Sequence, residues 1–188
     1  MSKGIVGAHR TGKTTLCEEA SKVYGTHFLE GEVATFLDSI KVDASIPMSF
    51  EIRIDAQEKL LDHHIKLWDE YRYFITDRTP LDFIMYTLHY VNASSPAEHE
   101  RVEAYINRCY EVNNEYFEHI YVLQPGIPIV QTTKNTGKQD AESIKILNEL
   151  MLGIISDVRN ESWYYVIHSS VTDIEDRVSI VTEAAIYG

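Results

Sequence analysis

The sequence predicts an α/β fold of three layers, in which a five-stranded parallel sheet lies between helices on both of its faces. Short apolar segments alternate with segments of helical periodicity along the 188 residues, which is the pattern of repeated βαβ units. A glycine-rich turn joins the first apolar segment to the first helix. No internal repeat, low-complexity segment or linker divides the chain, so we expect one domain over residues 1–188.

Five short apolar segments are the expected strands. They are Lys3–Val6, His27–Leu29, Tyr73–Thr76, Ile120–Leu123 and Trp163–Ile167. Strands separated by helices pair in parallel through right-handed crossovers. Their carboxyl ends therefore meet at one edge of the sheet, where ligands bind in open α/β folds.

Start signals mark two of the expected helices. Thr79-Pro80-Leu81-Asp82 places a capping threonine, a proline and an acidic residue in the order of a helix start, and Ser95-Pro96-Ala97-Glu98 repeats it. Apolar periodicity marks the other helices. These are a helix that ends at Gly25, a long helix over 49–68, a helix with the stripe Ile144, Leu147, Met151, Ile154 and Val158, and a last helix capped within Thr172–Glu175.

Composition narrows the class of protein. Hydrophobic residues make up 44% and charged residues 24%, as in globular domains, and no apolar run approaches the ~20 residues of a membrane span. The net charge of −12 argues against the broad basic surface that binds nucleic acid. The first residues run directly into a motif, which leaves no room for a signal peptide, and Cys17 and Cys109 fit buried thiols better than a disulfide or a zinc site. We expect a cytoplasmic protein without a membrane partner.

A phosphate-binding loop follows the first strand. Residues 7–14 match G-x-x-x-x-G-K-[ST] without a mismatch, and a strand before and a helix after supply the required context. Loop amides and the helix N-terminus bind phosphate oxygens, the lysine reaches the β- and γ-phosphates, and the threonine hydroxyl binds Mg²⁺. We therefore expect ATP and Mg²⁺ to bind here. The expected nucleotide-binding residues are Gly7, Ala8, His9, Arg10, Thr11, Gly12, Lys13, Thr14 and Thr15, of which Arg10 adds charge to the phosphates or faces solvent.

Three further segments extend this pattern: Leu29-Glu30-Gly31-Glu32, Phe50 to Gln57, and Phe74-Ile75-Thr76-Asp77-Arg78-Thr79-Pro80. With the loop, they resemble the P-loop nucleoside and nucleotide kinases. The likeness is to deoxynucleoside and thymidylate kinases, and especially to the small kinase-like ATPases related to nicotinamide riboside kinase that are common in phages. The resemblance spans most of the chain in element order, and it implies the strand order 2-3-1-4-5. Many such kinases are dimers, so a homodimer is left open.

The resemblance implies roles for two strand-end segments. Asp77-Arg78 is similar to the pair in which the acid lies near the metal, so we expect Thr14 and Asp77 at Mg²⁺ and Arg78 at phosphates or the acceptor. Glu30 is the candidate base that accepts the proton of an attacking hydroxyl, with Glu32 as the alternative. In the alternative interpretations, Asp77-Arg78 only caps a helix and pairs with neighbours, and the two glutamates are solvated loop residues.

Gln57 is the candidate for recognition of the acceptor. It lies in an apolar helical stripe with Ile54 and Leu61, and a buried amide there needs hydrogen-bond partners. The resemblance implies that a nucleobase supplies them, and Arg53, one turn earlier, could contact the same ligand. A glutamine bonded to backbone, or at the rim of the stripe, remains the alternative.

A polar segment over about 126–140 resembles a short lid. Kinases of this class place cations there to cover the transferring phosphate. Lys134 and Lys138 have the four-residue spacing of the family's arginines, but a lysine cannot form the planar bidentate clamp of an arginine. A solvated loop is the alternative.

Three functions remain open. The first is an ATP- and Mg²⁺-dependent kinase of a (deoxy)nucleoside or (deoxy)nucleoside monophosphate, a small-molecule partner. The second is a kinase that modifies bases within DNA, which the net charge disfavours. The third is an ATP-binding regulatory module without an acceptor. A polar, apolar-walled pocket near Gln57 favours the first, and a filled core there favours the third.

Overall fold

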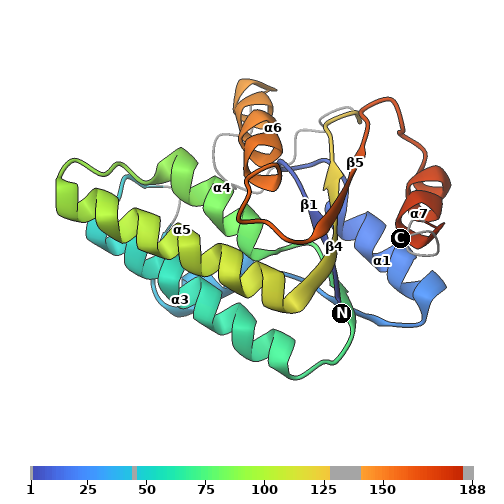
Figure 1. Cartoon of the computed structure of the whole chain (residues 1–188), viewed down its shortest axis with the longest axis horizontal. Helices are drawn as coiled ribbons and strands as arrows, with labels where there is room; N and C mark the ends of the chain where they lie inside the picture. Colours follow the sequence, from blue (N-terminus) through green and yellow to red (C-terminus); the bar gives the residue numbers. More distant parts are fainter. Residues whose placement is uncertain (1, 44–45, 128–140, 184–188) are drawn as a thin grey trace.

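The computed structural model describes residues 2–43, 46–127 and 141–183. It confirms the predicted α/β class (Figure 1). The elements in chain order are β1 (Ser2–Val6), α1 (Lys13–Tyr24), β2 (His27–Leu29), α2 (Val33–Ser39), α3 (Phe50–Asp69), β3 (Phe74–Thr76), α4 (Pro80–Tyr90), α5 (Pro96–Tyr116), β4 (Phe117–Leu123), α6 (Ala141–Ile155), β5 (Trp163–Ile167) and α7 (Ile174–Glu183).

The sheet has the strand order β2-β3-β1-β4-β5, and every described pairing is parallel. This is the order that the kinase resemblance implied. β1 lies at the centre, where Gly4 pairs with Thr76 of β3 on one side and with Ile120 of β4 on the other. The carboxyl ends of β1, β2 and β3 therefore lie side by side.

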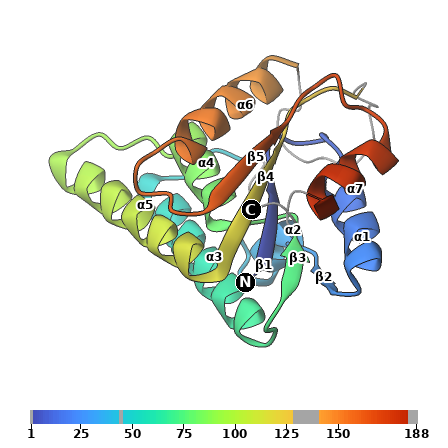
Figure 2. The ribbon, with the colours of Figure 1, turned by 45° about the vertical axis from the view of Figure 1, so that its right-hand side comes forward.

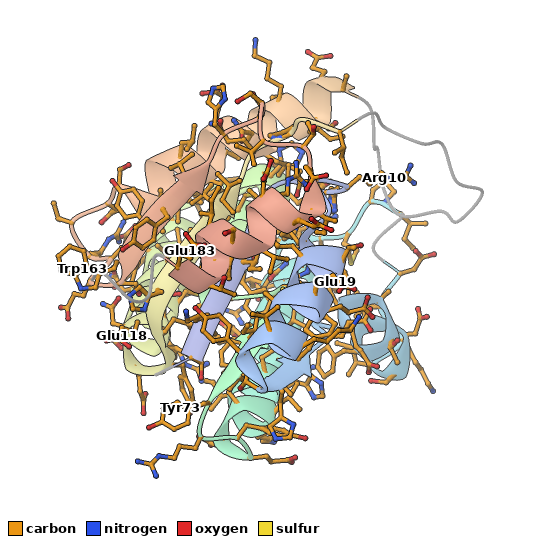
Figure 3. The ribbon with its side chains drawn as sticks, turned by 90° about the vertical axis from the view of Figure 1, so that its right-hand side faces the viewer. Arg10, Glu19, Tyr73, Glu118, Trp163 and Glu183 are labelled. Carbon is orange, nitrogen blue, oxygen red and sulfur yellow. The ribbon has the colours of Figure 1, made fainter. Side chains whose placement is uncertain are left out.

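One end of the sheet carries the segment that follows β1. Figure 3 shows Arg10, just beyond that strand, far from Tyr73 and Glu118 near the amino ends of β3 and β4. The phosphate loop thus lies at the carboxyl edge, as the parallel topology requires.

Helices cover both faces of the sheet, as Figure 2 shows. On one face α1 and α7 pack against each other over a core that includes Ile5, Leu16 and Val181. On the other face α3, α4, α5 and α6 enclose a larger core, in which Trp68 and Phe83 are almost fully buried. Burial of apolar area on both faces explains why the strands read as continuous hydrophobic runs.

The start signals read from the sequence are confirmed as two capping boxes. The Thr79 hydroxyl accepts from Leu81 N at 3.2 Å, and the Asp82 carboxylate accepts from Thr79 N at 3.0 Å. Ser95 and Glu98 make the corresponding pair at α5. Satisfying the free amides of a first turn stabilises a helix by about 1 kcal/mol per cap.

Some boundaries differ from prediction. α6 ends at Ile155, and Val158 beyond it is 97% exposed, so the predicted apolar stripe is wrong at its last member. β4 begins three residues earlier than expected, at Phe117. The helix α2 was missed: none of its seven residues is buried, and Glu32 before it caps no amide through its side chain. It carries no capping signal, and the helical spacing of its apolar residues Val33, Phe36 and Leu37 spans only one short segment.

The two cysteines agree with the sequence analysis. Cys17 and Cys109 are both buried and free. Within the ranges that the structure describes, no helix combines the length and the apolar character needed to cross a membrane.

Candidate active site

The phosphate loop adopts a conformation that requires its glycines. Gly7 and Gly12 have φ of 139° and 93°, and Arg10 is left-handed at 57°. A Cβ on Gly7 would lie 2.6 Å from the carbonyl oxygen of Leu123, so no other residue fits there without moving β4. The turn delivers the chain into α1 at Lys13, so the amino end of that helix faces the loop.

Lys13 is buried inside the loop. Its ammonium group donates to the carbonyls of Gly7 at 2.8 Å and Ala8 at 2.7 Å. Burial, with a smaller contribution from the nearby Arg78, lowers the pKa of Lys13 to about 8 against the opposing charges of Asp82 and Asp77. The cation is therefore enclosed by the loop, and its contact with phosphate oxygens remains a prediction of the motif.

Asp77 joins two strand ends. Its Oδ2 accepts from the Thr14 hydroxyl at 2.5 Å, and its Oδ1 accepts from the Gly31 amide at 2.9 Å. The side chain is 6% exposed, so these bonds fix it firmly between the phosphate loop and the segment after β2. The predicted metal pair, Thr14 and Asp77, is thus brought together.

The donor set of this pair fits Mg²⁺. A hydroxyl and a carboxylate are hard oxygen ligands, and Mg²⁺ in phosphate-transfer sites takes one or two protein oxygens and completes its shell with phosphates and water. Among the described residues no cluster of three or more His, Cys, Asp or Glu side chains forms a metal cage.

Gly31 places Glu30 beside Asp77. A Cβ on Gly31 would lie 2.0 Å from Cγ of Arg78, so only glycine allows the segment to pass this closely. Glu30 is exposed, and its pKa is raised by partial burial and by the charges of Asp77 and Glu32. The candidate base therefore lies within electrostatic reach of the predicted metal ligand.

His64 of α3 holds the same glycine from the other side. Its Nε2 lies 3.0 Å from the Gly31 carbonyl, and its Nδ1 lies 2.9 Å from the carbonyl of Leu60. Burial lowers the pKa of His64 to about 4, so the ring is neutral at pH 7 and its single N–H donates to one of these two carbonyls. The sequence analysis did not identify this residue, because no motif or spacing marks it.

Arg78 lies at the centre of a buried polar cluster. It is 3.8 Å from the Asp82 carboxylate and 5.7 Å from the centroid of the Tyr86 ring, and Tyr86 Oη bonds His9 Nδ1 at 3.1 Å. Burial, with smaller contributions from the charges of Lys13 and Arg78, lowers the pKa of His9 to about 3. Arg78 Nη1 has no hydrogen-bond partner within the described ranges, and it faces the Asp82 carboxylate at 3.8 Å.

The candidate acceptor residues of α3 face the same helix. The Arg53 guanidinium lies 5.4 Å from the Tyr90 ring, which stacks on Tyr86 with centroids 6.3 Å apart. Gln57 Oε1 is buried and has no partner in the described parts of the chain. Arg53, Tyr90, Tyr86 and Arg78 therefore form a continuous line from α3 to the phosphate loop. The sequence analysis did not identify Tyr86 and Tyr90; their four-residue steps from Asp82 are the signal that could have revealed this face.

A hollow of about 380 Å³ lies on the other side of the loop, between the end of β4 and α6. This volume is within the range of small-ligand sites. Of the predicted nucleotide-binding residues, His9 and Arg10 line it, whereas Gln57 and Arg53 do not. Its walls are His9, Arg10, Gln124, Pro125, Gly126, Ile127, Ala141, Ile144, Lys145, Asn148 and Ser169.

The predicted lid is not tested. Lys134 and Lys138 lie outside the described residues, together with the rest of 128–140. The lid remains a prediction from the resemblance.

Comparisons with known proteins were made by sequence and by structure. By sequence, the chain matches no protein-family model and no curated protein. By structure, it is similar to deoxyadenosine kinase from M. mycoides with dCMP and dCDP bound (TM-score 0.65, 16% identity, 100% of each chain covered). It is also similar to NadR in complex with NR, with a TM-score of 0.67 and 15% identity over 97% of this chain and 51% of that chain. A third match is YorR from Bacillus subtilis in complex with phosphorylated GDP, with a TM-score of 0.55 and 15% identity over 99% of this chain and 96% of that chain.

All three comparisons cover almost the whole of this chain, including the phosphate loop and the segments after β2 and β3. At such identities the likeness establishes the fold. The chain therefore has the fold of the P-loop nucleoside and nucleotide kinases, as its sequence resemblance implied.

Proposed function

We propose that this protein is an ATP- and Mg²⁺-dependent kinase that phosphorylates a (deoxy)nucleoside or (deoxy)nucleoside monophosphate. The observation that carries the proposal is the position of Asp77, which bonds the Thr14 hydroxyl of the phosphate loop and the amide next to Glu30. One side chain thus ties the nucleotide end of the site to the candidate base.

The residues supply what phosphoryl transfer demands, which is positioning and charge neutralisation. Loop amides and Lys13 hold the phosphates. Thr14 and Asp77 hold Mg²⁺, which neutralises phosphate charge when bound. Glu30 accepts the proton of a hydroxyl acceptor, and its raised pKa keeps it a stronger base than an ordinary glutamate. Arg78, which is paired with Asp82, supplies a buried positive charge for the acceptor or the transferring phosphate.

The residues around Gln57 favour an acceptor that is small and polar and has an aromatic or planar part. Gln57 carries a buried, unpaired oxygen, and Arg53 lies against Tyr90 on the same wall. The structural neighbours were solved with dCMP and dCDP, with NR and with phosphorylated GDP, so their ligands are small nucleosides and nucleotides. The net charge of −12 opposes a DNA substrate.

The test is a phosphorylation assay with ATP, Mg²⁺ and a panel of nucleosides and nucleoside monophosphates, in which ADP and product are measured separately. We expect one acceptor class to be phosphorylated and Lys13→Ala to lower kcat/KM by about 100-fold or more. Lys66→Ala, which removes an exposed lysine of α3, is the matched control and should keep full activity. ATP binding without any phosphorylated acceptor would refute the kinase and favour a regulatory module.

Residue roles are separated in the same assay. Glu30→Gln should abolish the acid limb of the kcat/KM profile, whose midpoint in the wild type should lie above the ordinary pKa of glutamate because that pKa is raised. Gln57→Leu should raise KM for the acceptor and leave KM for ATP unchanged. An unchanged acid limb in Glu30→Gln would transfer the base role to Glu32, which Glu32→Gln would then test.

A further inference from the structure

Arg177, in the first turn of α7, is an arginine that the proposed chemistry does not use. It is 2% exposed, although it lies 166 residues along the chain from its contact in the phosphate loop. Figures 2 and 3 show α7 lying against α1, and the two helices are in contact. α1 is the helix that follows the phosphate loop. The guanidinium group is therefore buried behind the loop.

Two of its three nitrogens have backbone partners. Nε donates to the Val171 carbonyl at 2.7 Å, and Nη1 donates to the Thr11 carbonyl at 3.0 Å. Nη2 is buried without a hydrogen-bond partner, and the guanidinium has no ion-pair partner, in the ranges that the structure describes. Burial lowers the pKa of Arg177, but an arginine stays protonated at neutral pH. A buried cation that lacks a counter-charge is costly.

The contact with Thr11 sets the direction of one loop amide. In a trans peptide the carbonyl and the following N–H point in opposite directions. Because Arg177 holds the Thr11 carbonyl, the Gly12 N–H points away from the guanidinium. The group also packs on Gly12 itself, since a Cβ there would lie 3.3 Å from Nη1. A side chain at Gly12 would be strained at its φ of 93° and would press on the guanidinium.

We propose that Arg177 is a positioning residue of the nucleotide site, which orients the Thr11–Gly12 peptide and places a buried positive charge behind it, with the polyphosphate of the bound nucleotide as its counter-charge. The inference rests on the proposed binding of nucleotide by the phosphate loop. Its contribution should grow with the negative charge of the ligand, so the ranking is ATP and ADP above AMP. By reciprocity, the nucleotide should stabilise the packing of α7 by the same free energy.

The experiment compares wild type, Arg177→Met, Arg177→Lys and the control Arg108→Met. Arg108 forms an exposed ion pair with Asp62 between α5 and α3, so its loss changes net charge equally but far from the loop. Calorimetric Kd values are measured for ATP, ADP and AMP with Mg²⁺, and Tm is measured with and without ATP. Circular dichroism checks that each variant is folded. Arg177→Lys keeps the charge, and it replaces Arg177→Met in the affinity comparison if Arg177→Met does not fold.

We expect Arg177→Met to weaken ATP and ADP by about 10- to 100-fold, AMP by clearly less, and to shrink the ATP-induced rise in Tm. Arg177→Lys should fall between, and Arg108→Met should match the wild type. A lower Tm of the free protein with unchanged Kd values and an unchanged ATP-induced shift would show a purely structural arginine and overturn the inference. If the wild type binds none of the three nucleotides, both the inference and the proposed function fall. If the wild type binds ATP but phosphorylates no acceptor, the proposed function fails. A larger loss of affinity for ATP and ADP than for AMP in Arg177→Met would then still uphold the inference.

Discussion

At the scale of single residues, the close packing of side chains around Gly31 determines the position of the segment that carries the candidate base. Gly31 is enclosed on three sides: its amide donates to Asp77, its carbonyl lies 3.0 Å from His64 Nε2, and Arg78 lies over its α-carbon. The segment that carries Glu30 is therefore held by its backbone. Any side chain at position 31 must displace the two residues to which we assign metal and phosphate contacts.

Gly31→Ala should consequently reduce stability and activity together. Overpacking of this kind costs about 1–3 kcal/mol, and displacement of Arg78 and Asp77 should lower kcat/KM by more than the loss of folded protein explains. Gly153→Ala is the control, because a Cβ in that exposed helical position meets nothing within 4 Å, and it should stabilise by about 0.5–1 kcal/mol without changing activity. Urea unfolding and the kinase assay measure both. Normal activity in folded Gly31→Ala would contradict the close fit.

At the scale of elements, α4 serves both stability and the site. It begins at the capping box of Thr79 and Asp82 directly after β3, and it carries Tyr86 and Tyr90 on the face that meets Arg53. α5 begins at a box of the same kind, at Ser95, but its described contacts are with neighbouring helices and β4. The two helices thus begin with the same kind of capping box, but only α4 carries residues of the candidate site.

Removal of the two caps should separate these roles. Thr79→Ala and Ser95→Ala should each lower the free energy of unfolding by about 0.5–2 kcal/mol. Only Thr79→Ala should also raise KM for the acceptor, because its loss frees the turn that places Arg78 and Asp82. Equal acceptor KM values in the two variants, measured well below Tm, would show that α4 does not position the site.

At the scale of the whole molecule, a neutral buried histidine links folding to pH. The pKa of His64 is near 6.5 when unfolded and about 4 when folded, because burial disfavours the charged ring. Between these values the unfolded chain binds more protons, so the free energy of unfolding falls as pH is lowered from about 6.5 to about 4. The same protonation would add charge to the contact that holds Gly31.

His64→Gln should therefore flatten the acid side of the stability profile. Between pH 7.5 and pH 5, the wild type should lose about 2 kcal/mol more than this variant. His99→Gln is the control, because it removes an exposed imidazole of α5 and should keep the wild-type profile. Urea unfolding at the two pH values measures the difference, and parallel profiles for wild type and His64→Gln would rule out His64 as its source.

Local signals made much of the fold predictable. The phosphate loop occupies eight consecutive residues, each capping box four, and each strand a short apolar run, so their physical causes are contained in the segment itself. The strand order was obtained from the resemblance, because pairing between β1 and β4 joins residues more than a hundred positions apart. The helix α2 is short, begins without a side-chain cap and buries its apolar face only in part, and it escaped prediction.

The sequence by itself determined the phosphate loop, the helix starts and the alternation of strands and helices, since short-range chemistry dictates each. It also placed Asp77, Arg78 and Glu30 at strand ends. Only the tertiary structure decided that Asp77 bonds both Thr14 and Gly31, that His64 closes on that glycine, and that Arg177 reaches Thr11. These contacts join residues 33 to 166 positions apart, and no periodicity or spacing encodes them, because they arise only when the sheet brings its carboxyl ends together.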